Sequence, residues 1–289
     1  MFVLIALFES LTKNLISFWE DAPSLIVLIA FFLTWVGCWL PIALILTKVF
    51  NWAPSKSLQS EHKIPLLVSL YLLAPLILRV TCWLTHKSFS SYGWRGNFSI
   101  LYSFSLGLGL GVLSLAFVFG CHLCFGLCKL KISNLKSLPS TLFPVVLVAI
   151  LVGGVEELVF RGFLFSQLQQ NYSIWTTAIA SSLIFASLHL VWERNETIPQ
   201  LPGLFLMGMV LVLARLADNG SLGLAWGLHT GWVWSIATID TLNLIDYTGK
   251  VPEWITGKNK KPLAGVAGIF CMGITTLVLC LFLDKLSTA

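Results

Sequence analysis

Residues 148–161 read VAILVGGVEELVFR, so that two adjacent glutamates and an arginine stand at the end of an otherwise apolar segment. A carboxylate inside such a segment costs about 2.5 kcal/mol or more on membrane-insertion scales. Ionisable side chains within membrane segments therefore usually face a bundle interior or a water-filled cavity, where they have a function. Glu156, Glu157 and Arg161 are thus the first candidates for a functional site.

The rest of the chain is as apolar as this segment. Of its 289 residues, 57% are hydrophobic and 11% are charged, whereas about a quarter of a soluble domain is charged. A membrane-spanning helix needs about 20 apolar residues. Eight stretches qualify, at residues 24–50, 64–84, 98–127, 139–167, 173–192, 201–217, 222–245 and 263–283. We therefore expect an all-α, polytopic helical bundle of about eight transmembrane helices in the lipid bilayer.

Composition divides the chain into three expected parts. Residues 1–22 carry apolar side chains at helical spacing with charged ones between them, which predicts an N-terminal interfacial helix rather than a removed signal peptide. Residues 23–137 then hold the N-terminal transmembrane helices, and residues 138–289 form the transmembrane region with the ionisable residues. Lys and Arg concentrate in alternate loops, which predicts that both termini lie outside the cytoplasm. The sequence contains no basic helix and no aromatic–basic patch, so we expect no nucleic-acid partner.

Two histidines lie in later apolar spans, His189 in 173–192 and His229 in 222–245. At a rise of 1.5 Å per residue, Glu156 and both histidines fall near the middle third of the bilayer, so the three side chains can converge on one cavity. Glu157 and Arg161 are four residues apart and can pair on one helix face. Glu156 then points about 100° away around the helix and can face the cavity.

A carboxylate and two imidazoles around a sheltered water molecule suffice to hydrolyse a peptide bond. Glu156 can serve as the general base, while one histidine polarises the water and the other donates a hydrogen bond to the oxyanion. Alternatively, Glu156, His189 and His229 can ligate Zn²⁺, since a set of two histidines and one glutamate leaves a fourth position open for water. The residue types suit both chemistries.

The strings Glu156-Glu157-x-x-x-Arg161 and Phe185-x-x-x-His189, followed by the membrane histidine His229, resemble the three motifs of the CPBP family. That family holds the type II CAAX prenyl endopeptidases and the Abi-type bacteriocin-processing or immunity proteins. The resemblance covers about residues 138–247 and makes 138–289 a CPBP-like catalytic region.

This resemblance implies an intramembrane endopeptidase whose partner is a membrane-associated protein or peptide, prenylated CAAX-type substrates included. Glu156 and His189 would activate water, and His229 would stabilise the oxyanion. The remaining motif residues would support them; these are Glu157, Arg161 and Phe185.

The sequence departs from the family pattern at Val233, one turn after His229, where many members have Asn or Asp. Asp240 lies about 16 Å further along the helix axis, too far to replace that side chain. The run Gly231-Trp232-Val233-Trp234 resembles a variant of cyanobacterial and plastid branches, which favours a bacterial inner membrane, such as a cyanobacterial plasma or thylakoid membrane. Val233 also supports an alternative, a non-proteolytic CPBP-like scaffold or immunity protein. A small transporter is a third reading, but no internal repeat supports it.

Overall fold

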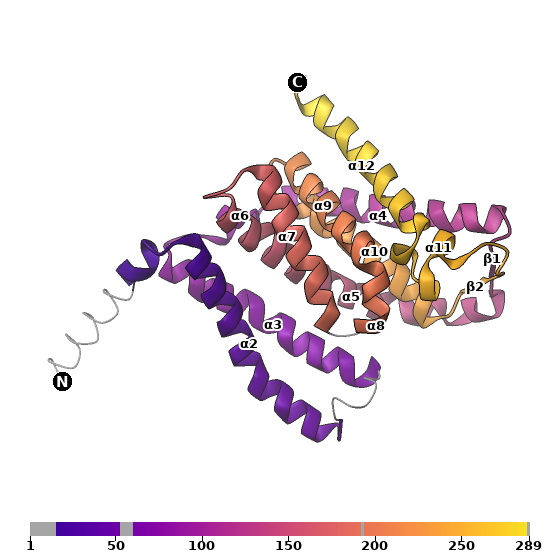
Figure 1. Ribbon diagram of the computed structural model, residues 1–289, viewed down its shortest axis with the longest axis horizontal. Helices are drawn as coiled ribbons and strands as arrows, with labels where there is room; N and C mark the ends of the chain where they lie inside the picture. The colour runs from indigo at the N-terminus through magenta and orange to yellow at the C-terminus, as the bar shows by residue number, and fades with distance from the viewer. Residues whose placement is uncertain (1–15, 53–59, 192–193, 288–289) are drawn as a thin grey trace. The chain divides into compact units, whose positions relative to one another are not determined.

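The computed structural model describes residues 16–52, 60–191 and 194–287, and this part of the chain is almost entirely helical (Figure 1). The predicted interfacial helix at 1–22 lies largely outside the described residues, although residues 16–20 are helical. The chain divides into two compact units. Unit 1 contains residues 1–92 and 166–171, and unit 2 contains residues 93–165 and 172–289.

Unit 1 is built on two long helices, α2 (Ser24–Val49) and α3 (Ser60–Leu84), which pack against each other. The indole N–H of Trp35 joins them by donating to the Leu70 carbonyl at 2.8 Å. The short helix η1 (Phe89–Tyr92) follows α3, and the Tyr92 hydroxyl accepts a hydrogen bond from the Gln167 amide at 3.2 Å.

Unit 2 holds the remaining helices and a small sheet. Its elements are α4 (Phe98–Cys124), β1 (Cys128–Leu130), η2 (Ile132–Ser137), α5 (Leu138–Glu156), η3 (Glu157–Leu164), the first residue of α6 (Phe165–Leu168), α7 (Ile174–Leu188), η4 (His189–Val191), α8 (Arg194–Thr197), η5 (Ile198–Gln200), α9 (Leu201–Ala217), α10 (Gly223–Thr241), β2 (Ile245–Tyr247), α11 (Glu253–Thr256), η6 (Lys258–Lys260), η7 (Pro262–Ala264) and α12 (Val266–Ser287).

Helix α10 occupies the centre of unit 2. It packs against α4, α5 and α9, while α9 also packs against α7 and α12 (Figure 1). Strands β1 and β2 pair antiparallel, with Cys128 opposite Tyr247, and they connect the ends of α4 and α10. The central position of α10 explains why a residue such as His229 can meet side chains from several helices.

Small residues bring α4 and α10 into close contact. A Cβ atom on Gly111 would lie 2.6 Å from the Leu228 carbonyl oxygen, and one on Gly227 would overlap the Phe104 carbonyl. Gly107 also faces α10, whereas Gly109 faces open space. The glycine cluster of α4 therefore permits close helix packing through two of its three members.

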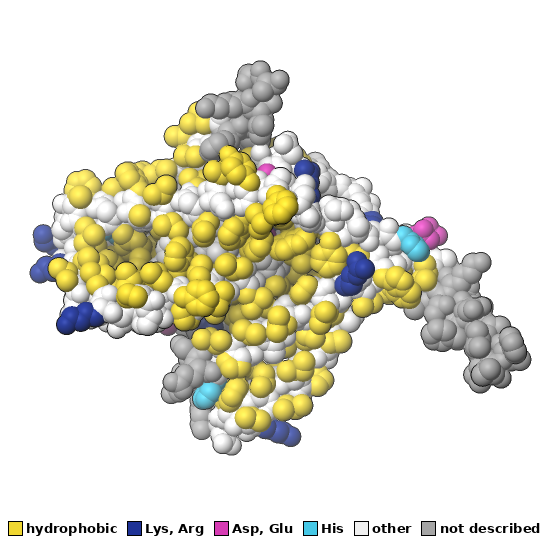
Figure 2. Space-filling view, turned by 180° about the vertical axis from the view of Figure 1, so that it is seen from behind, with side chains coloured by type: hydrophobic (Ala, Val, Ile, Leu, Met, Phe, Trp, Pro, Cys, Tyr) yellow, Lys and Arg dark blue, Asp and Glu magenta, His cyan; other side chains and the backbone are white. Residues whose placement is uncertain are grey.

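Within the described residues, six helices are long and apolar enough to cross a membrane: Ser24–Val49, His62–Leu84, Phe98–Cys124, Ile132–Leu168, Ile174–Val191 and Arg194–Ala217. Helix α10 and the shorter apolar helix Val266–Leu281 correspond to the last two predicted spans. Figure 2 shows hydrophobic side chains over much of the visible face, and residues such as Leu113 and Phe143 are exposed. The predicted polytopic helical bundle is confirmed, and the chain is an integral membrane protein.

Candidate active site

The glutamate pair lies at a change in helix type. Helix α5 ends at Glu156, and the following eight residues, Glu157–Leu164, form the π-helix η3, in which every residue is buried. Hydrogen bonds in a π-helix run from residue i to i+5, and such segments are rare and frequent at functional sites. This wider turn presents Glu156 and Glu157 to different neighbours.

Glu157 connects three parts of the site. Its Oε1 atom accepts a hydrogen bond from Arg161 Nη1 at 3.0 Å and another from His229 Nδ1 at 2.8 Å. All three side chains are at most 2% exposed. The spacing of four residues predicts the pair with Arg161, but the contact with His229 on α10 has no signal in the sequence.

The same contact assigns the proton on the His229 ring. A carboxylate that already binds an arginine acts as an acceptor, so that Nδ1 of His229 carries a hydrogen. The other ring nitrogen, Nε2, lies 3.6 Å from Glu156 Oε2, close enough for an ion pair and longer than a direct hydrogen bond. His229 therefore lies between the two adjacent glutamates.

His189 follows the last residue of α7 and is held by the helix that precedes it. Its Nδ1 atom lies 2.8 Å from the backbone carbonyl oxygen of Phe185, which can only accept a hydrogen bond. In the neutral ring, Nε2 of His189 is then an acceptor. A water molecule bound there would donate a hydrogen to it.

The ring of Phe185 separates and supports the polar groups. The guanidinium of Arg161 lies 4.1 Å from its centroid, within cation–π range. The imidazoles of His189 and His229 contact the same ring edge-on, at 4.7 and 6.1 Å between centroids. Phe185 is fully buried, so it fixes the positions of all three side chains by packing.

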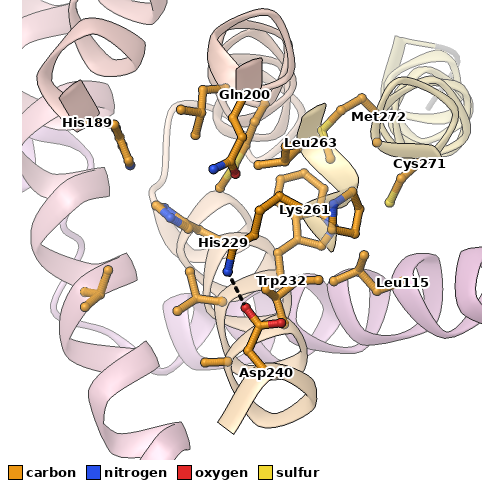
Figure 3. A pocket seen from close by; sticks show the side chains of 18 of the residues that line it. Leu115, His189, Gln200, His229, Trp232, Asp240, Lys261, Leu263, Cys271 and Met272 are labelled. Atoms are coloured by element: carbon orange, nitrogen blue, oxygen red, sulfur yellow. Dashed lines mark hydrogen bonds and ion pairs between the residues drawn. The ribbon is translucent and has the colours of Figure 1, made fainter. Parts of the chain in front are cut away.

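Glu156, His189 and His229 all line one cavity of about 300 Å³ in unit 2. Figure 3 shows His189 and His229 on the same side of it. Most of the remaining lining is apolar and comes from α4, α5, α9, α10, η7 and α12: Leu115, Val152, Leu204, Met207, Trp232, Val233, Ile236, Ala237, Pro262, Leu263, Cys271 and Met272. The site thus places Glu156, His189 and His229 beside a largely apolar chamber suited to an apolar ligand.

Arg215 is a further buried cation near the site. It lies inside α9 and is 7% exposed. Its guanidinium donates to the backbone carbonyl of Arg161 and lies 5.0 Å from the centroid of Phe165. The position of Arg215 near the end of an apolar span gives no sign of this contact in the sequence.

Two further residues of α10 face the same cavity. Val233 lines it and offers no hydrogen bond. Asp240 lines it too, but its Oδ2 accepts a hydrogen bond from Lys261 Nζ at 2.7 Å (Figure 3). Asp240 therefore belongs to another pair, and the partner of the His229 ring is Glu157 instead.

The zinc alternative can be compared with the donor geometry. His189 Nδ1 is hydrogen-bonded to a backbone carbonyl, and His229 Nδ1 is hydrogen-bonded to a carboxylate. Hydrogen bonds of this kind also orient imidazoles that bind a metal through the other ring nitrogen. However, no three His, Cys, Asp or Glu side chains lie close enough to hold a metal ion within the described ranges. As arranged here, the donors do not fit a metal centre.

Comparison with known proteins identifies the class of the central region. The family model described as type II CAAX prenyl endopeptidase Rce1-like matches residues 138–235. This segment runs from α5 into α10 and contains Glu156, Glu157, Arg161, His189 and His229. These residues carry an Rce1-like domain, and the prediction of a CPBP-family protein is confirmed for this part of the chain.

A curated relative gives no further indication of activity. It is an Escherichia coli protein described as "Uncharacterized 24.3 kDa protein", 29% identical over 89 residues, or 30% of this chain. The chain spans 40% of the length of that relative. No solved structure matches. The match of residues 138–235 to a prenyl endopeptidase family supports a peptidase class for this segment in general.

Proposed function

We propose that this chain is an intramembrane endopeptidase that hydrolyses a peptide bond of a membrane-associated protein, prenylated CAAX-type proteins included. One observation carries the proposal: Glu156, His189 and His229, from three different helical segments, border a single apolar cavity. Ionisable groups are costly there and would be maintained for chemistry. The match of residues 138–235 to a prenyl endopeptidase family supports the same reaction class.

The proposed reaction begins with a water molecule between Glu156 and His189. Nε2 of His189 accepts a hydrogen bond from the water and orients it, while the Glu156 carboxylate takes the other proton. The resulting hydroxide attacks the carbonyl carbon of the scissile bond and forms a tetrahedral oxyanion. An apolar chamber strengthens these interactions because it excludes competing water.

His229 can stabilise the oxyanion only when Nε2 also carries a proton, since Nδ1 is already committed to Glu157. Glu156 Oε2 is 3.6 Å from Nε2, so a small movement lets Glu156 pass on the proton that it took from water. The imidazolium then lies between the two carboxylates and donates through Nε2 to the oxyanion. The same proton goes to the leaving amine nitrogen as the carbon–nitrogen bond breaks.

The supporting residues act on the orientation of His229. Glu157 holds the ring through Nδ1, and Arg161 fixes Glu157 from the opposite side. Phe185 packs against the guanidinium and both imidazoles. We expect substitutions of these residues to lower kcat through misplacement of His229.

The Glu156→Gln variant tests the proposal, because it keeps the side-chain shape and removes the base. The purified protein in nanodiscs would be offered a fluorogenic peptide anchored by a prenyl group and, separately, one with a plain transmembrane anchor. Loss of a general base should lower kcat by about 10²–10⁴-fold. The matched control is Glu20→Gln, which removes an exposed glutamate of the helical residues 16–20 in unit 1 and should change nothing.

Cleavage by Glu156→Gln at the rate of the unmodified protein would refute the proposed mechanism. The alternative of a non-proteolytic scaffold, which Val233 favours, predicts a different pattern. Under that alternative, Glu156→Gln leaves the cellular phenotype unchanged, while disruption of the Glu157–Arg161 pair abolishes it through misfolding. The two variants together therefore separate an enzyme from a scaffold.

A further inference from the structure

A second cavity of unit 2 adjoins the catalytic one. It has a volume of about 320 Å³ and shares four lining residues with the first cavity: Ile236, Asp240, Lys261 and Pro262. Its other lining residues are mostly polar or aromatic: Phe119, Glu196, Ile239, Asn243, Ile245, Tyr247, Asn259 and Lys260. An apolar chamber and a polar chamber thus meet at one boundary.

An ion pair forms the polar part of that boundary. Lys261 reaches across the cavity to Asp240, with Nζ and Oδ2 2.7 Å apart (Figure 3). The two side chains are 30% and 41% exposed, so solvent screens their attraction. Exchanging such a partner costs little, since solvent-exposed ion pairs contribute little to stability. Lys261 can therefore leave Asp240 for another carboxylate.

The polar cavity supplies further hydrogen-bond donors. Lys260 lines it beside Lys261, and the Tyr247 hydroxyl is buried and has no hydrogen-bond partner within the described residues. Burial, together with the nearby Cys128 and Asp240, raises the pKa of Tyr247, so that its hydroxyl remains a donor at physiological pH. This hydroxyl is therefore a donor that an acceptor entering the cavity can satisfy.

We propose that the polar cavity binds a carboxylate of the substrate and that Lys261 releases Asp240 to pair with it. This inference rests on the proposed endopeptidase function and names a specificity determinant for it. The apolar cavity would hold the segment next to the cleaved bond, and Lys260, Lys261 and Tyr247 would hold the charged group beyond it.

The geometry also gives the spacing. His229 and Asp240 are eleven residues apart on α10, about 16 Å along the helix axis. An extended peptide covers about 3.3 Å per residue, so that a carboxylate up to about five residues from the cleaved bond fits this span. A C-terminal carboxylate and an acidic side chain at that distance share the required chemistry.

Binding to the Glu156→Gln variant tests the inference without requiring cleavage. Three fluorescent leucine-rich peptides would be used in nanodiscs: one with a free C-terminal carboxylate, one amidated, and one amidated with an aspartate near its end. We expect the carboxylate peptides to bind about tenfold more tightly than the neutral one, as a charge-assisted hydrogen bond allows. The tighter of the two charged peptides identifies the source of the carboxylate.

Variants of the boundary pair make the prediction specific. In the Glu156→Gln protein, Lys261→Met should reduce the preference for carboxylate peptides over the neutral peptide to less than about twofold. Lys261→Arg should retain that preference. Asp240→Asn removes the competing carboxylate and should strengthen binding of the charged peptides. The matched control is Lys258→Met, an exposed lysine of η6 that lines neither cavity, which should leave the preference unchanged.

Three results would overturn the inference: equal binding of charged and neutral peptides, no binding of any peptide, or an unchanged preference in Lys261→Met. The proposed endopeptidase function is refuted by a different result, namely that the unmodified protein cleaves none of the peptides. A Lys261-dependent preference without cleavage would support the carboxylate site and refute the protease.

Discussion

Replacing Arg161 by methionine should destabilise the protein by about 3–5 kcal/mol, the cost of removing one partner from a buried ion pair. Arg161 is 1% exposed, and the Glu157 carboxylate that it contacts at 3.0 Å is fully buried. Methionine fills much of the same volume, so the lost charge is the main change. The contact of the guanidinium with Phe185 contributes about 0.5–2 kcal/mol more.

A double substitution separates the charge effect from packing. In Glu157→Gln/Arg161→Met no charge remains buried at the pair, and a neutral amide can still accept from His229. We therefore expect the double variant to recover more than half of the stability that Arg161→Met loses. Thermal unfolding in detergent would report both values, since 3–5 kcal/mol corresponds to a decrease in Tm of roughly 10 °C.

The control for this experiment is Arg194→Met, which removes an exposed arginine of α8 and should change stability by less than about 0.5 kcal/mol. The predicted cost of the unpaired buried charge is refuted if the free energy of unfolding of Arg161→Met lies within about 1 kcal/mol of that of the unmodified protein. It is also refuted if the double variant is no more stable than Arg161→Met, because the buried carboxylate would then not be the cause.

Three further predictions concern packing, the oxyanion site and metal. Gly227→Ala should cost about 1–3 kcal/mol through overlap with the α4 backbone, whereas Gly109→Ala, which faces open space, should be neutral or stabilising in the same unfolding assay. Val233→Asn adds a hydrogen-bond donor to the cavity and should raise kcat by up to about tenfold, while Val233→Leu should not. Metal analysis should find well under one zinc ion per chain in both the unmodified protein and Glu156→Ala. If the unmodified protein bound one zinc ion per chain and Glu156→Ala bound none, the proposed metal-free reaction would be contradicted.

Much of the fold follows from hydropathy and helical periodicity. The apolar spans agree with the observed helices because burial in lipid depends on composition over about 20 residues. The pairing of Glu157 with Arg161 follows from their spacing on one helix. The depths of Glu156, His189 and His229 in their spans allow a shared cavity, and the tertiary structure places all three on one.

Contacts between helices required the tertiary structure. The hydrogen bond from His229 to Glu157 joins residues 72 positions apart. The hydrogen bond from Arg215 to the Arg161 carbonyl joins residues 54 positions apart. The π-helix that carries Glu157 likewise has no signature in the residue pattern.

The amino-acid sequence thus determined which residues lie in the membrane and which of them share a helix face, because both properties are local. The tertiary structure decided that Glu157 holds His229, that Arg215 is buried, and that Lys261 pairs with Asp240. Those contacts depend on how each helix rotates against its neighbours, and close packing of the whole bundle sets that rotation.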